Sequence, residues 1–168
     1  MNRYRFPMLV GILLVWSAAA GAESLERLRS LTGDLHRNER YLAEIRSGLN
    51  EAATAGLFAL NDEQLNAVQR SAIFVDTARL ICRYQRELFA VTPYIRKDAR
   101  SDFFTLRHRD LGDAIFESRE VVKALRLYGA AVEAPDIREL AEEGRAAVSA
   151  NIRLFEMMRD GVAPLTNR

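Results

Sequence analysis

The stretch LRSLTGDLHRNERYLAEIRSGL, residues 28–49, places four leucines seven residues apart and adds an apolar residue three positions after two of them. These apolar positions are Leu28, Leu31, Leu35, Leu42, Ile45 and Leu49. Such spacing predicts a helix with one buried stripe. A helical bundle and an intermolecular leucine zipper share this packing pattern, so the rest of the chain must decide between them.

Three further segments show the same helical period, while strand-like alternation is absent and the sequence contains no Asn-Gly hairpin dipeptide. With the first segment they predict helices over residues 24–55, 61–91, 101–129 and 135–160. Short connections make sequence neighbours into spatial neighbours, which favours one antiparallel up-down-up-down bundle. The fold class is therefore all-α, and the leucine stripe finds its partners within its own chain. An intermolecular zipper is the alternative.

Local signals set the expected helix ends. Gly56 is a candidate left-handed stop for the first helix, with Leu57 folding back onto its last turn. Asn61 is a candidate cap for the second helix. Either Asp98 or Ser101 could cap the third helix, and Pro135 suits the first turn of the fourth.

The second helix is expected to be the most enclosed of the four. Its apolar residues, which include Ile73, Val75, Leu80 and Phe89, cover more than one face. A helix that is apolar on several faces is usually surrounded by other helices.

The chain begins MNRYRFPMLVGILLVWSAAAGAES, with two arginines before an apolar run from Met8 to Ala20 and small residues up to Ala22. This three-part pattern predicts a cleaved signal peptide over residues 1–22 and a bundle domain over 23–168. The apolar run is shorter than the roughly 20 residues of a membrane span, so a retained anchor is the weaker alternative. We expect a periplasmic or secreted protein without a stable membrane span.

Charge and cysteine content narrow the possible partners. The chain has 24 basic and 23 acidic residues, and nucleic-acid binders usually carry a basic excess, so a nucleic-acid partner is not expected. Cys82 is the one cysteine, which excludes an internal disulfide. It is expected to be a buried, inert thiol. An intermolecular disulfide is the alternative, and the sequence is compatible with a homodimer.

Three polar residues interrupt the apolar stripes: Asn38, Ser118 and Asn151. A buried polar group must find a partner, and it does so in only one alignment of the helices. We interpret these residues as fixing the register of the bundle.

Most catalytic and cofactor signatures are missing. Neither histidine follows a glutamate by three residues, as di-iron bundles require, and one cysteine cannot attach haem covalently. Counting outward from the loops places His36, Cys82, His108 and Met158 at roughly one level of the bundle, with His108 and Met158 on apolar stripes. These residue types ligate haem iron or copper. No cofactor is the leading expectation, and a haem b or copper carrier is the alternative.

Positive charge is densest in YIRKDARSDFFTLRHRD, residues 94–110, where the second helix gives way to the third. The candidate ligand- or partner-binding residues there are Tyr94, Arg96, Lys97, Arg100, Phe103 and Arg107. Arginine forks and aromatic faces suit an anionic small molecule or an acidic partner surface. A solvated loop with internal ion pairs is the alternative interpretation.

The same end of the bundle should hold the start of the mature chain and its C-terminal tail, so several segments could contribute to one site. No reaction follows from these residues, so enzymatic activity is uncertain and a non-enzymatic role is favoured. The sequence thus predicts an exported helical-bundle module, with a sensor-like or accessory role, that binds a partner protein or an anionic small ligand.

Overall fold

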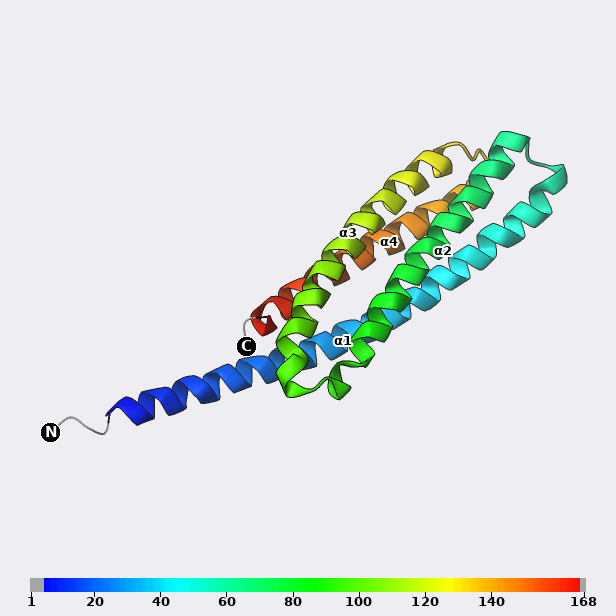
Figure 1. The fold of residues 1–168 in the computed structure, drawn as a ribbon. Helices are drawn as coiled ribbons and strands as arrows, with labels where there is room; N and C mark the ends of the chain where they lie inside the picture. The colour runs from blue at the N-terminus through cyan, green and yellow to red at the C-terminus, as the bar shows by residue number, and fades with distance from the viewer. Residues whose placement is uncertain (1–4, 167–168) are drawn as a thin grey trace.

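The computed structural model describes the backbone of residues 5–166 and the side chains of residues 23–57 and 59–166. Within these residues the chain is an antiparallel up-down-up-down four-helix bundle, as predicted (Figure 1). The helices are α1 (Arg5–Ala55), α2 (Asp62–Ala90), α3 (Arg100–Ala130) and α4 (Pro135–Val162). Each helix packs beside its sequence neighbour, and α1 also packs along α4, which closes the bundle.

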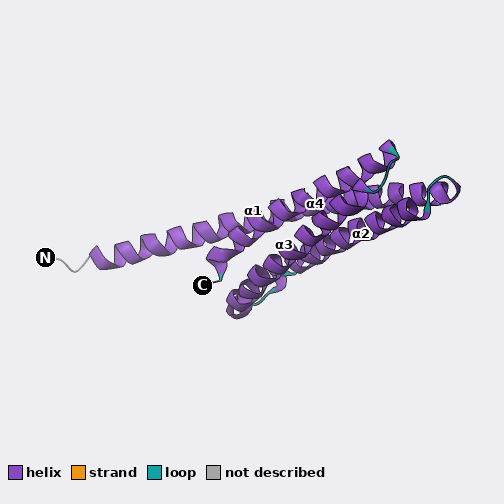
Figure 2. Ribbon diagram, turned by 90° about the horizontal axis from the view of Figure 1, so that it is seen from above, coloured by secondary structure: helices purple, strands orange, loops and turns teal. Residues whose placement is uncertain are grey.

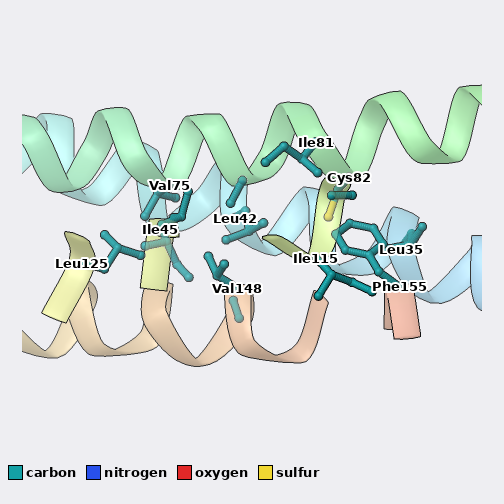
Figure 3. Packing of buried hydrophobic residues seen from close by; sticks show 14 of the residues in the cluster. Leu35, Leu42, Ile45, Val75, Ile81, Cys82, Ile115, Leu125, Val148 and Phe155 are labelled. Carbon is teal, nitrogen blue, oxygen red and sulfur yellow. The ribbon is translucent and has the colours of Figure 1, made fainter. Parts of the chain in front are cut away.

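The leucine stripe of α1 lies inside the bundle. Leu28, Leu31, Leu35, Leu42, Ile45 and Leu49 are all buried. Figure 3 shows Leu35 beside Cys82, Ile115 and Phe155, so each of the four helices supplies one residue to this part of the core. The stripe therefore finds its partners within its own chain.

A second layer forms around Gly144 of α4. A Cβ atom placed on Gly144 would lie 2.9 Å from Val75 Cγ2, 3.6 Å from Ile45 Cγ2 and 3.9 Å from Leu125 Cδ1. These three residues come from α2, α1 and α3. The absence of a side chain on Gly144 thus lets α4 approach the other three helices closely.

Helix α1 begins earlier than the sequence predicts. Its backbone is helical from Arg5, and the helix continues beyond the other three at the N-terminal end (Figure 2). The predicted signal peptide covers residues 1–22, of which residues 1–4 lie outside the described part of the chain. Its cleavage stays a prediction. None of the helices has, among the described residues, the length and hydropathy needed to cross a membrane.

The turn after α1 differs from the prediction. No residue in the described chain has positive φ, so Gly56 is not a left-handed stop, and it starts a short 3₁₀ turn over Gly56–Phe58. Leu57 is exposed, and Leu60 packs against Gly56 in its place. A side chain at residue 56 would overlap Leu60, so this close approach is what requires glycine here.

The other helix starts can be compared directly with their signals. Asn61 caps α2 as predicted, since its side-chain oxygen accepts a hydrogen bond from Gln64 N at 2.8 Å. Neither Asp98 nor Ser101 caps α3, which begins after Ala99 without a side-chain cap. Ser101 Oγ donates to Thr166 O at 2.6 Å instead, which ties the C-terminal segment to the start of α3. Pro135 opens α4 as predicted.

The prediction that α2 is the most enclosed helix is wrong. Its residues Ile73 and Leu80 are 62% and 49% exposed, and Tyr84 continues the same outward face. A four-helix bundle buries only one side of each member, so apolar residues on a second side remain in solvent.

Two of the three polar residues on the stripes, Asn38 and Asn151, are placed as the register hypothesis expects, whereas the Ser118 hydroxyl has no hydrogen-bond partner among the described residues. Asn151 and Ser118 are buried, and Asn38 is half-buried. Asn38 Nδ2 donates to Ala147 O at 2.9 Å and also to Asn151 Oδ1, so these amides join α1 to α4 at one level. Sliding either helix by one turn would leave the Asn151 amide without this partner.

Candidate functional site

A cavity of about 860 Å³ opens at the end of the bundle where α2 gives way to α3. Its walls come from α1, from the end of α2, from the connection to α3 and from the C-terminal segment. The lining residues used below are Leu28, Arg29, Gly33, His36, Arg86, Phe89, Lys97, Arg100, Ser101, Phe104 and Leu165. Sequence reasoning had placed the binding site at this end.

Apolar side chains form the floor of the cavity. Leu28, Phe89, Phe104 and Leu165 line it, and all four are buried. Leu165 belongs to the 3₁₀ turn Ala163–Leu165 that follows α4, and the Ser101–Thr166 hydrogen bond holds this turn in place. The C-terminal segment therefore closes one side of the floor.

Cations dominate the charged part of the lining. Arg29, Arg86, Lys97 and Arg100 line the cavity, whereas none of its lining residues is aspartate or glutamate. The whole chain has nearly equal numbers of acids and bases, so this lining departs strongly from the average composition. The field in the cavity is consequently positive and favours an anion.

Three of these cations are available to a ligand. Arg29 and Lys97 are exposed and form no ion pair with any described residue. Arg100 is half-buried, and its only hydrogen bond among the described residues is a long one of 3.4 Å from Nε to Ile95 O. Each can therefore turn toward a ligand without breaking an ion pair.

Arg86, the fourth cation of the lining, is half-buried and already neutralised. Its Nε lies 3.0 Å from Glu39 Oε2, and His36 Nδ1 lies 3.8 Å from the same oxygen. The Arg86 and Glu39 atoms are close enough for an ion pair but are not aligned for a hydrogen bond. The positive charge that remains uncompensated is thus that of Arg29, Lys97 and Arg100.

The predicted binding residues divide into two groups. Lys97 and Arg100 line the cavity. Tyr94 is 85% exposed and does not line the cavity, and Arg96, which pairs with Asp98 at 2.9 Å, does not line it either. Phe103 packs edge-on against Phe104, with ring centroids 5.4 Å apart, and so supports the floor from behind.

Arg107 is buried and belongs to the core rather than to the cavity. Its guanidinium pairs with Asp110 and lies over the Phe103 ring, 5.5 Å from the centroid. The charge of this long side chain is paired within α3, while its carbon atoms pack in the core. A pattern of apolar residues in the sequence does not reveal that an arginine is buried in this way.

The cavity also contains residues that sequence reasoning missed. Arg29 and Arg86 lie on α1 and α2, outside the charged segment 94–110, and Leu165 lies near the C-terminus. One sequence signal could have found them. Counting residues outward from the loops places the start of the mature chain, the start of α3 and the C-terminal tail at the same end of the bundle. The arginines themselves were not distinctive, since the chain has many.

The residues proposed for haem or copper differ in burial. His108 is exposed, so its expected position on the buried stripe of α3 is wrong, and Arg107 takes that position. His36 is also exposed, whereas Cys82 and Met158 are buried. Among the described residues no three His, Cys, Asp or Glu side chains gather as a metal site. The haem or copper alternative stays a prediction.

The environment of Cys82 suits an inert thiol. Burial raises the pKa of Cys82 far above its usual range, and the negative charge of Glu39 raises it further. The thiol is therefore protonated at neutral pH, and the thiolate needed for metal binding or disulfide exchange is disfavoured.

A shallower hollow of about 460 Å³ lies between α1 and α4. Its lining includes Asp34, which pairs with Arg37, and Arg153, which is exposed and forms no ion pair with any described residue. This hollow is smaller than the cavity and, unlike it, contains an acid. Comparison of the chain with protein-family models, with curated proteins and with solved structures gave no match. The function is accordingly argued from the larger cavity.

Proposed function

We propose that this chain is a non-enzymatic, exported binding module that takes up an anionic small molecule in the cavity between α1, the end of α2 and the start of α3. The observation that carries the proposal is the lining, which has four cations and no acid around an apolar floor. Export rests on the N-terminal signal pattern, with the periplasm or the exterior as destination.

The shape of the site favours a small molecule over a partner protein. Small-molecule sites are concave, usually have volumes of about 300–1,000 Å³, and combine apolar walls with a few polar groups. The cavity volume of about 860 Å³ lies in this range. Protein partners more often bind flatter surfaces around a central cluster of anchor residues.

The lining also gives reason to propose binding rather than catalysis. The hydroxyls of Thr32 and Ser101 donate hydrogen bonds to the carbonyl oxygens of Leu28 and Thr166. A nucleophilic hydroxyl instead needs a neighbouring base to which it can donate its proton.

The test uses 8-anilinonaphthalene-1-sulfonate, an anionic fluorophore, and the chain from Glu23 onward. Wild type should bind one equivalent saturably, and Arg29→Glu/Lys97→Glu should weaken binding at least about tenfold, equivalent to about 1.4 kcal/mol. The matched control is Arg40→Glu/Arg126→Glu, which changes the net charge equally at two exposed arginines outside the cavity. Equal binding by the cavity variant and wild type, or an equal loss in the control, would refute the proposal.

A further inference from the structure

We infer that the ligand is a single-chain amphipathic anion, with an acidic head at the Arg29–Lys97–Arg100 rim and a hydrocarbon tail along the apolar floor. This inference rests on the proposed function and specifies the chemical class of its ligand. The observation behind it is that the cations of the lining are exposed or half-buried, whereas the apolar residues of the same cavity are buried.

The cations and the apolar residues lie at different depths. Arg29 and Lys97 are exposed and Arg100 is half-buried, whereas Leu28, Phe89 and Phe104 are buried. An ion moved down to the apolar floor would lose its hydration without gaining a partner, which is costly. The charged part of a ligand therefore belongs at the rim, and only an apolar part gains by filling the depth.

The fourth cation of the lining does not offer a second place for the head. Arg86 lines the cavity, and Glu39 already balances its charge at 3.0 Å. A dianion with a charge at each end would have to compete with this carboxylate. One charged end and one apolar end match the lining better than two charged ends.

The cavity is long enough for an extended tail. On α1 the lining runs from Leu25 to His36, which corresponds to about 16 Å at about 1.5 Å per residue. An inorganic anion would occupy only the rim of such a site. A flexible chain can instead follow the floor past Leu28 and Phe89, where each buried methylene is removed from water.

Gly33 makes the tail and the head separately testable. It lines the cavity, and a Cβ atom placed on it would have no heavy atom within 4 Å. Gly33→Leu should thus add an apolar side chain to the cavity wall, starting from a Cβ that meets no neighbour, and it leaves the three rim cations unchanged. Gly112→Leu is the matched control, since Gly112 is also helical, has the same open space and lies outside the cavity.

Calorimetric titration of the chain from Glu23 onward would compare hexanoate, octanoate and decanoate, all below their micelle concentrations. The dissociation constant should fall about three- to fourfold for each added methylene. Gly33→Leu should weaken decanoate at least about tenfold, because the tail loses its place on the floor, whereas Gly112→Leu should not. Decanol, which lacks the charge, should bind at least about tenfold more weakly than decanoate.

The outcomes separate this inference from the proposed function. If acetate or inorganic phosphate binds as tightly as decanoate and Gly33→Leu has no effect, the tail is refuted while anion binding stands. If decanol equals decanoate, or if none of these anions nor the anilinonaphthalene sulfonate binds, both proposals fall. Binding to vesicles of anionic phospholipid without binding of monomeric decanoate would refute a free amphiphile and identify a membrane lipid as the source of the head.

Discussion

Replacing Arg107 by methionine should destabilise the bundle far more than the same replacement at Arg96. Both arginines lie in the charged segment between residues 94 and 110, and both pair with an aspartate of that segment. Methionine keeps most of the apolar stem and removes the charge. The comparison therefore measures what the charge contributes at a buried and at an exposed position.

The magnitude follows from the burial of each pair. The side chains of Arg107 and Asp110 are 10% and 18% exposed, whereas those of Arg96 and Asp98 are 83% and 67% exposed. Removing one partner of a buried pair costs about 3–5 kcal/mol, because the other charge stays buried and unpaired. Asp110 keeps some contact with water, and Arg109 Nε lies 3.9 Å from its Oδ1, so we expect the lower end of this range, about 3 kcal/mol. An exposed pair contributes about 0–1 kcal/mol.

Thermal denaturation followed by circular dichroism would measure the difference. For a domain of this size 1 kcal/mol shifts Tm by about 2–4 °C, so Arg107→Met should lower Tm by about 6–12 °C and Arg96→Met by at most about 4 °C. Adding Asp110→Asn to Arg107→Met should restore part of the loss, because the stranded charge is removed. If Arg107→Met melts within about 2 °C of wild type, the buried pair does not hold α3 as described.

Three further predictions concern the core. Asn38→Leu should cost about 1–3 kcal/mol in urea unfolding by stranding the Asn151 amide, and Asn38→Leu/Asn151→Leu should recover most of it; additive losses would contradict the register role. Gly144→Ala should lower Tm through its 2.9 Å contact, whereas Gly112→Ala, with open space, should raise stability by about 0.5–1 kcal/mol; equal effects would contradict the packing. Because burial raises the pKa of Cys82, the unfolded thiol ionises first, and stability should fall above about pH 8.5 by up to about 1.4 kcal/mol per pH unit. Urea unfolding at several pH values would measure this, and above about pH 8.5 the free energy of unfolding should fall less steeply with pH for Cys82→Ala than for wild type.

The fold was predictable because each helix carries its own periodic signal. The heptad leucines are buried, and the stops near Gly56, Val91, Gly129 and Gly161 agree with the observed ends within a few residues. A bundle with short connections has few alternative topologies, so helix count and loop length were enough. The residue conformations inside those turns were less predictable, as the right-handed φ at Gly56 shows.

The prediction of which residue faces the core failed on α3, where a charged residue is buried. His108 was placed on the buried stripe of α3, but Arg107 is buried there and His108 is exposed. Both positions fit the spacing of the stripe. The choice between them depends on Asp110 and Phe103, which give the guanidinium a partner and a ring to lie over, and neither contact is visible in a single helical pattern.

The location of the candidate site was predictable in part. Charge density pointed to Lys97 and Arg100, and counting outward from the loops brought the chain ends to the same level. The sequence could not show that the connection after α2 leaves space above Phe89 and Phe104, because cavities depend on how helices end in three dimensions. The level count could have named Arg29, since it lies one residue after the buried Leu28.

The cavity follows from how the helices end. Within the body of the bundle each layer is filled from four helices, as around Gly144. At the end of the bundle where α2 ends at Ala90 and α3 starts at Arg100, α1 continues beyond the other helices (Figures 1 and 2). The connection after α2 lies on that side of α1 in place of a helix, so the layer stays incomplete and apolar residues face an open space.

This origin explains why binding and stability should be separable in this protein. The exposed rim cations Arg29 and Lys97 contribute no ion pair within the described residues, so their replacement should leave the melting temperature almost unchanged. Arg107 lies in the same charged region but holds α3 through Asp110. A set of charge reversals that included Arg107 would lower the stability of the fold together with ligand capture, so the two effects could not be told apart. Only variants confined to the rim or to Gly33 can assign a loss of capture to the cavity itself.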